Sequence, residues 1–130
     1  MKAAWFEAFG NANEVIRVGE QAKPKAGLGE VLVRLQTSGV NPSDVKKRAG
    51  AFPNLLQDGP VIPHSDGAGV IEAVGDKVAN SRVGERVWVY QAQFARSLGT
   101  AAEYVALDSN RAVSLPDNTD FDVGACLGIP

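Results

Sequence analysis

Short apolar runs, each closed by a glycine or proline turn, follow one another along most of this chain and limit what it can fold into. The clearest run, Glu30 to Val40, places Val31, Val33 and Leu35 on one face, which is the two-residue period of a strand with a buried side. Similar runs are Lys2 to Phe6, a segment with Val15, Ile16 and Val18, Gly67 to Val74, Arg86 to Tyr90, Glu103 to Ala106, and Ala112 to Leu115. Many short strands joined by tight turns predict a barrel or sandwich.

Short helices are expected between these strands. Asn41 can cap a helix over Ser43 to Arg48, with Pro42 in the first turn, where a missing N–H costs nothing. Thr119 can cap a second helix, and the acids that follow it favour a first helical turn. The expected fold class is therefore α+β, mainly β with short helices.

Composition and charge exclude several classes of function. Hydrophobic residues make up 45% of the 130 residues and the net charge is -2, so a core can form and no nucleic-acid partner is expected. Cys126 is the only cysteine; it leaves no internal disulfide and is expected to be a buried small residue. We see no signal peptide and no apolar stretch of about 20 residues. The protein is therefore expected in the cytoplasm, without a membrane partner.

Two motifs suggest a cofactor-binding or catalytic site, but their residue spacing does not fit either kind of site. Gly67–Gly69 would need a third glycine at Glu72 to make a dinucleotide-binding fingerprint, so we expect a strand that another backbone approaches closely. His64 stands beside Ser65 and Asp66, but side chains adjacent in sequence rarely converge as a catalytic triad. Further histidine or cysteine ligands for a metal are lacking. We interpret His64 as a loop residue.

Three blocks and the C-terminal segment follow the order of a known family: Ser38-Gly39-Val40-Asn41-Pro42-Ser43-Asp44, Asp66 to Val78, Val83-Gly84-Glu85-Arg86-Val87, and Gly124 to Pro130. With them the whole chain resembles the medium-chain dehydrogenase/reductase superfamily, in the zinc-free quinone oxidoreductase branch that includes zeta-crystallin. The resemblance implies that residues 1–130 form a GroES-like β-barrel on the substrate side. It also implies that a Rossmann domain, absent from this chain, follows in the parent protein and holds most of the cofactor.

The same resemblance implies that no zinc is bound. In zinc-containing relatives a cysteine ligand stands where Asn41 stands here, and a histidine ligand stands where Ser65 stands. His64 aligns with a glycine, and the cysteine-rich loop for structural zinc has no counterpart. The implied activity is hydride transfer from NADPH to a quinone or an α,β-unsaturated carbonyl, although the residues that choose between NADPH and NADH lie outside the chain.

Two residues receive catalytic roles from the resemblance. Asn41 would lie at the junction of nicotinamide and substrate, binding the cofactor and donating to the oxygen that becomes negative; one such donor lowers a barrier by about 2–4 kcal/mol. Its alternative role is only to cap the helix. Lys46 stands where enone and alkenal reductases carry a lysine that donates a proton or a hydrogen bond to the carbonyl. Its alternative is a solvated helix residue beside Lys47 and Arg48.

Three residues are candidates for substrate binding. Phe52 and Tyr90 can wall a flat ring, since aromatic faces stack on conjugated acceptors, and Ser65 is the third candidate. Core packing is the alternative, and it is what we expect for Trp88.

Three other functions remain open at this point. The chain could be the N-terminal domain of a zinc-type alcohol dehydrogenase, or a GroES-like module that acts alone in binding or assembly. An oligonucleotide-binding barrel lacks the expected basic groove and aromatic platform. In every case an apolar C-terminal surface should promote a homodimer or self-association, and its residues are Phe121, Val123, Leu127 and Ile129.

Overall fold

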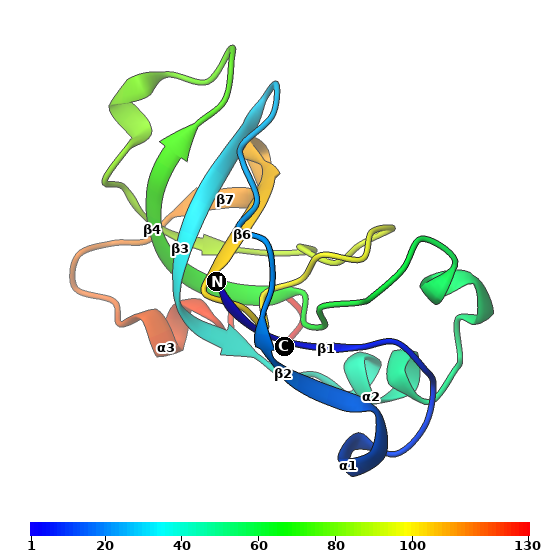
Figure 1. Ribbon diagram of the computed structural model, residues 1–130. Helices are drawn as coiled ribbons and strands as arrows, with labels where there is room; N and C mark the ends of the chain where they lie inside the picture. The colour runs from blue at the N-terminus through cyan, green and yellow to red at the C-terminus, as the bar shows by residue number, and fades with distance from the viewer.

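The computed structural model describes residues 1–130 as two antiparallel sheets with three short α-helices (Figure 1). The larger sheet has the strand order β6-β3-β4-β5-β7. Its strands are β3 (Glu30–Gly39), β4 (Asp66–Val74), β5 (Arg86–Val89), β6 (Tyr104–Asp108) and β7 (Ala112–Ser114). The smaller sheet is a hairpin of β1 (Lys2–Phe6) and β2 (Ile16–Glu20). This arrangement confirms the mainly β fold class with short helices.

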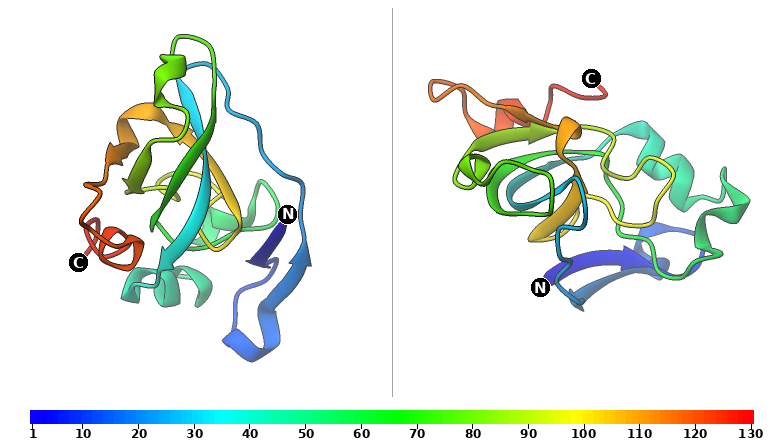
Figure 2. Two further views of the ribbon diagram at one scale, coloured as in Figure 1. Left: turned by 90° about the vertical axis from the view of Figure 1, so that its left-hand side faces the viewer. Right: turned by 90° about the horizontal axis from the view of Figure 1, so that it is seen from above.

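The strands do not close into a continuous barrel. The large sheet is open between β6 and β7, and isolated bridges such as Ala3–Ala102 and Phe6–Val61 connect the hairpin to the rest of the chain. Figure 2 shows the hairpin on one side of the large sheet, with the C-terminal helix and the chain end on the opposite side. The C-terminal face of the sheet is therefore separate from the face that the hairpin covers.

The core follows the predicted alternation along the strands. Val31 and Val33 of β3 are fully buried, as are Val87 and Val89 of β5. They belong to one cluster with Ile71, Ala92, Val105, Leu107 and Ala112. Each large apolar side chain buried in this way contributes about 1.5–3 kcal/mol, so this cluster holds β3 to β7 together.

Gly69 confirms the interpretation of the glycines in β4 as a close approach of two backbones. A Cβ atom at this position would lie 2.1 Å from the carbonyl oxygen of Arg34 on β3. The β3–β4 register shifts twice near this point, between Leu32 and Val33 and between Leu35 and Thr37. Only glycine allows β3 and β4 to pair so tightly there.

The helices begin and end slightly away from their expected positions. Helix α2 (Pro42–Arg48) starts one residue early, and α3 (Phe121–Gly124) has Asp120 at its N-cap instead of Thr119. Val15, expected in a strand, ends α1 (Ala12–Val15), because the chain turns between β1 and β2 there. Short 3-10 turns lie at Pro53–Leu56, Asn80–Arg82 and Ser109–Arg111. None of the helices combines the length and apolar character that crossing a bilayer requires.

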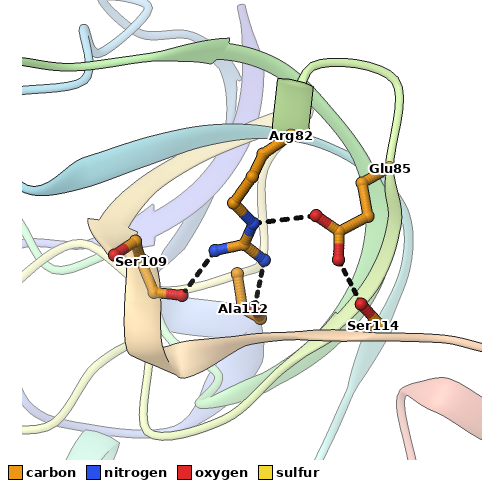
Figure 3. Close-up of polar contacts among 5 residues, drawn as sticks. All are labelled: Arg82, Glu85, Ser109, Ala112 and Ser114. Carbon is orange, nitrogen blue, oxygen red and sulfur yellow. Dashed lines mark hydrogen bonds and ion pairs between the residues drawn. The ribbon is translucent and has the colours of Figure 1, made fainter. Parts of the chain in front are cut away.

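Arg82 fastens the β4–β5 connection to the strand at the sheet edge (Figure 3). Its Nε donates to the Glu85 carboxylate at 2.8 Å, and its Nη atoms donate to the carbonyl oxygens of Ser109 at 2.9 Å and Ala112 at 2.6 Å. The hydroxyl of Ser114 donates to the other Glu85 oxygen. The hydrogen bonds from Arg82 and Ser114 hold the pKa of Glu85 below its usual range. This cluster fixes β5, the strand that leads into Tyr90.

Candidate active site

Asn41 and Asp66 meet where β3 and β4 come together. Asn41 follows β3, and Asp66 is the first residue of β4, paired with Gly39. Asn41 Nδ2 donates to Asp66 Oδ2 at 2.9 Å, and the two residues are 6% and 0% exposed. A carboxylate can only accept, so Asp66 determines which end of the Asn41 amide carries nitrogen. The second N–H of that nitrogen donates to no other group of the chain.

Asn41 also begins helix α2. Its main-chain N–H donates to Asp44 Oδ2 at 2.7 Å, and its main-chain oxygen accepts from the Asp44 N–H at 2.9 Å. These bonds satisfy groups that a helix start would otherwise leave unpaired. One residue therefore serves the helix through its main chain and meets Asp66 through its amide.

The C-terminal segment wraps around the Asp66 carboxylate. The main-chain N–H of Ile129 donates to Oδ2 at 3.0 Å, while Oδ1 is buried without a partner. A Cβ atom on Gly128 would lie 2.3 Å from Oδ1, so only glycine fits there. A buried acceptor without a donor costs about 1–3 kcal/mol, and it marks this carboxylate as a place where a ligand N–H or O–H would be stabilised.

A cavity of about 420 Å³ opens beside Asp66. Its walls are Trp88, Tyr90, Gln91 and the segment Leu127–Ile129. The rings of Trp88 and Tyr90 lie 5.6 Å apart and are tilted by 40°. Trp88 was expected in the core, and this was wrong, because its neighbours on β5 take the inward positions and leave it half-buried at the cavity.

The two lysines of α2 lie in different surroundings. Lys46 is exposed, whereas Lys47 is half-buried and donates from Nζ to Gln93 Oε1 at 3.0 Å. Burial lowers the pKa of Lys47, and the charge of Asp44 opposes this shift. The half-buried lysine with a lowered pKa is therefore Lys47, the residue after the predicted proton donor Lys46. The role of Lys46 stays a prediction.

Phe52 and Ser65 do not face the cavity beside Asp66. Phe52 is 53% exposed and lines a second cavity, formed by residues 51–58 and 95–97. Ser65 is buried, and its carbonyl accepts from the Ala92 N–H at 3.0 Å. The structure therefore brings Asn41 and Tyr90 together around Asp66 and places Phe52 in a different cavity. Their roles in binding remain predictions.

Asp66 is the central residue that sequence reasoning missed as a site candidate. A carboxylate at the start of an apolar, glycine-containing strand is a usable signal, since charged residues are almost never fully buried unless they are paired. Lys47 and Gln93 were missed because their partnership joins α2 to a loop far along the chain, which no local pattern reveals.

His64 takes part in a directional chain of hydrogen bonds. Thr100 Oγ1 donates to the main-chain oxygen of Asp66 at 2.6 Å, Ser38 Oγ lies 2.8 Å from Thr100 Oγ1, and His64 Nδ1 lies 2.8 Å from Ser38 Oγ. A carbonyl only accepts, so each hydroxyl must donate toward Asp66 and His64 must donate from Nδ1. Burial lowers the pKa of His64, against the charge of Asp44. His64 lies in a loop, as expected, with a φ of 77° that L-residues rarely adopt.

No group of three or more His, Cys, Asp and Glu side chains is placed to hold a metal ion. Cys126 was expected to be buried, and this was wrong: it is exposed, because its segment follows α3 along the surface. The residues that could meet a ligand at the Asp66 site therefore offer amide, carboxylate and aromatic groups.

Known proteins share both the sequence and this fold. The alcohol dehydrogenase GroES-like domain family matches residues 27–117. Mouse quinone oxidoreductase is 34% identical over 133 positions, which cover 100% of this chain and 38% of the relative. An alcohol dehydrogenase from Geobacillus stearothermophilus is also 34% identical, over 99% of this chain and 45% of its own length. This chain thus spans less than half of these relatives.

Solved structures agree with this assignment. The quinone oxidoreductase from Coxiella burnetii superposes with a TM-score of 0.90 at 26% identity, over 99% of this chain and 41% of its own. A mycobacterial protein solved in complex with NADPH gives a TM-score of 0.81 at 29% identity, over 96% of this chain and 37% of its own. With the family match covering most of the chain and the fold agreeing over nearly all of it, this chain belongs to the alcohol dehydrogenase GroES-like domain family, within the medium-chain dehydrogenase/reductase superfamily.

Proposed function

We propose that residues 1–130 are the substrate-side domain of an NADPH-dependent oxidoreductase that reduces a quinone or an α,β-unsaturated carbonyl without zinc. The observation that carries this proposal is the Asn41 amide, whose orientation is fixed by Asp66. The adjoining cavity has two aromatic walls. We expect a Rossmann domain after this chain to hold most of the cofactor, and we expect the protein in the cytoplasm.

The lengths of the matches favour a quinone oxidoreductase over an alcohol dehydrogenase. The match to the mouse quinone oxidoreductase extends over 133 positions for this chain of 130 residues, so the two are nearly collinear. The match to the alcohol dehydrogenase extends over 155 positions, so at least 25 of them have no counterpart here. The chain is therefore shorter than the matching part of the alcohol dehydrogenase and nearly equal in length to the matching part of the quinone oxidoreductase.

The chemistry assigned to this chain is stabilisation of a developing negative charge. When bound, the reduced nicotinamide supplies the hydride, and the electrons of the conjugated acceptor move onto its carbonyl oxygen. The second Nδ2 hydrogen of Asn41 donates to that oxygen. Because Asp66 already fixes the amide, little reorganisation is needed at the moment of reaction, which is the condition under which such donors are most effective. Lys46 is proposed to supply the proton that an enolate needs.

The residues present fit the reactive end of the cofactor. The cavity beside Asp66 can take a flat ring between Trp88, Tyr90 and the C-terminal segment, and the buried Asp66 Oδ1 can accept from a carboxamide N–H. Within these residues no glycine-rich turn leads from a strand into a helix, as a pyrophosphate would require. We therefore assign this chain contacts with the nicotinamide ring alone.

The test is hydride transfer by the full-length protein that carries these residues. NADPH oxidation is measured with 1,4-naphthoquinone and with a simple enone, and the Asn41→Ala variant is measured beside the wild type. Turnover that requires an acceptor and falls in the variant is the expected result. Oxidation of an unconjugated alcohol in preference to either acceptor would refute the proposal.

A zinc-type alcohol dehydrogenase domain is the second candidate, because one relative carries that name. Elemental analysis of protein purified without chelator separates the two. We expect no stoichiometric zinc, since an amide and a hydroxyl stand at positions 41 and 65. One equivalent of bound zinc would favour the dehydrogenase.

A further inference from the structure

The second cavity, of about 400 Å³, lies between two loops. Residues 51–58 form one side and contribute the ring of Phe52, and residues 95–97 contribute the side chain of Arg96. A flat hydrophobic surface and a guanidinium group thus line the same space. Asp58 is the only acidic residue that lines it, and it is exposed, where solvent screens its charge.

The loop at residues 91–96 carries one half-buried cation, Arg96, and two others, Lys47 and Arg111, donate hydrogen bonds to it. Arg96 donates to the carbonyl oxygen of Ala106 at 2.5 Å, Lys47 donates to Gln93 Oε1, and Arg111 donates to the carbonyl oxygen of Gln91 at 3.1 Å. All three acceptors are neutral. The ion pairs of the structure involve the N-terminus, Lys23 and Arg82 instead. Positive charge therefore accumulates around this loop without a carboxylate in contact.

Arg96 and Lys47 have lost part of their contact with solvent. Burial lowers the pKa of Arg96, and the nearby charge of Arg111 lowers it further against the opposing charge of Glu30. Burial likewise lowers the pKa of Lys47. The loop that carries Arg96 has a left-handed backbone at Gln91 and at Ala95, with φ values of 51° and 55°. Such conformations cost roughly 1–3 kcal/mol each and cluster at ligand sites.

An anion in the cavity would relieve this accumulation of charge. Arg96 uses one N–H of its five for Ala106, so a fork of donors remains for a planar carboxylate or a sulfonate. The ring of Phe52 is 53% exposed and can stack on a conjugated ring attached to that anion. Charge and aromatic surface thus indicate one kind of ligand.

We propose that this cavity is a binding subsite for a flat organic anion: Arg96 binds a carboxylate or sulfonate group, and Phe52 stacks on the conjugated ring that carries it. The subsite goes beyond the proposed function, because it lies outside the Asn41–Asp66 site and shares no lining residue with the cavity there. A ring held against Phe52 is therefore not the ring that is reduced.

Binding to the 130-residue chain tests the subsite without requiring turnover. The chain labelled with ¹⁵N is titrated with 1,4-naphthoquinone-2-sulfonate, with neutral 1,4-naphthoquinone, with sodium sulfate and with NADPH, and NMR shift changes are mapped. We expect the sulfonate to shift residues 51–58 and 95–97, including Arg96 Nε, and to bind at least about ten-fold more tightly than the neutral quinone. Equal affinity for both quinones, or shifts that map elsewhere, overturn the subsite.

Variants identify which group recognises the anion. Arg96→Gln should weaken the sulfonate about ten-fold or more and leave the neutral quinone within about two-fold, while Arg96→Lys should fall between. Arg17→Gln is the matched control, because Arg17 is exposed on β2 and its loss changes the net charge equally. Thermal melting identifies any variant that has simply lost its fold. An equal loss in the Arg17 and Arg96 variants would mean that only overall charge matters, and would overturn the proposal.

Three further outcomes separate this subsite from the proposed function. If NADPH shifts residues 95–97 and displaces the sulfonate, the cations serve a cofactor phosphate and the proposed subsite is wrong. If the full-length protein reduces quinones but the sulfonate binds wild type and Arg96→Gln equally, the reductase function stands and the subsite falls. Binding of the sulfonate to wild type but not to Arg96→Gln, in a protein without hydride transfer, keeps the anion site and refutes the reductase.

Discussion

Asp66 accepts a hydrogen bond from the side-chain amide of Asn41 at 2.9 Å, and both residues are buried. The carboxylate cannot donate, so the amide nitrogen must face it. This relationship fixes the orientation of the Asn41 amide. The bonds that begin α2 use the main chain of Asn41, so a side-chain substitution tests the amide alone.

Replacing Asn41 with Ala in the full-length protein should lower kcat about 10²- to 10³-fold, the usual loss for one oxyanion donor, with a smaller effect on cofactor affinity. Asn41→Ser is the matched control: both variants keep the main-chain bonds that begin α2, and serine keeps a polar side chain that is too short to reproduce the amide. Steady-state kinetics and thermal melting are measured for both. If kcat is unchanged and only the melting temperature falls, the amide serves the fold through Asp66 and not the reaction.

Lys46→Met should slow reduction of enones more than reduction of quinones. An enolate must receive a proton, whereas a hydroquinone anion is more stable and water can protonate it. Lys47→Met is the neighbouring control: it removes the bond to Gln93 and should alter stability more than the ratio of the two rates. The measurement is kcat for both acceptors in all three proteins. Equal losses for both acceptors in the Lys46 variant would remove it from proton transfer.

Arg82→Met should destabilise the domain by about 1–3 kcal/mol, because it removes the ion pair with Glu85 and two hydrogen bonds from the guanidinium to neutral carbonyl oxygens. The pKa of Glu85 is lowered in the folded state, so the ionic part is complete above the unfolded value of about 4.3 and is lost as pH falls through the lower folded value. Chemical denaturation at pH 7 and near pH 3 measures the difference between variant and wild type. A difference that grows on acidification would contradict this assignment.

His64 should be neutral near pH 7, with its proton on Nδ1. The hydrogen bonds through Ser38 and Thr100 fix this tautomer, and the ¹⁵N shifts of the ring report it directly. Burial lowers the folded pKa of His64, so the unfolded chain binds a proton first. Its contribution to stability is complete above about pH 6.5 and declines as pH falls toward the folded value. A proton found on Nε2 alone would disprove the inferred direction of the chain.

Residues 1–130 by themselves should fold but show no NADPH oxidation, because cofactor positioning alone can be worth about 7–11 kcal/mol. They should also self-associate through three exposed side chains, Val123, Leu127 and Ile129. Phe121, expected in this surface, is partly covered by the Arg86 guanidinium 4.5 Å above its ring. Sedimentation of wild type and of a Leu127→Ser, Ile129→Ser double variant measures association. Identical sedimentation of both, or turnover like that of an intact reductase, would contradict the prediction.

Alternation of apolar residues was enough to locate most strands, because burial on one face leaves a period of two in the sequence. Val87 and Val89 were found in this way. Whether the sheets close into the expected barrel was not foreseeable, since closure depends on which strand edges meet; here the large sheet stays open and its surroundings are joined by isolated bridges. Asn41 could be selected from its motif. Its partner Asp66 and the pair Lys47–Gln93 could not, because their contacts join segments far apart in the chain.

Asp66 also connects Asn41 to the end of the described chain, because the N–H of Ile129 donates to the same carboxylate oxygen that receives the amide. One carboxylate oxygen therefore joins the position of the segment after α3 to the orientation of the Asn41 amide. A displacement of Ile129 would be felt at the start of α2, although the two lie far apart in the sequence.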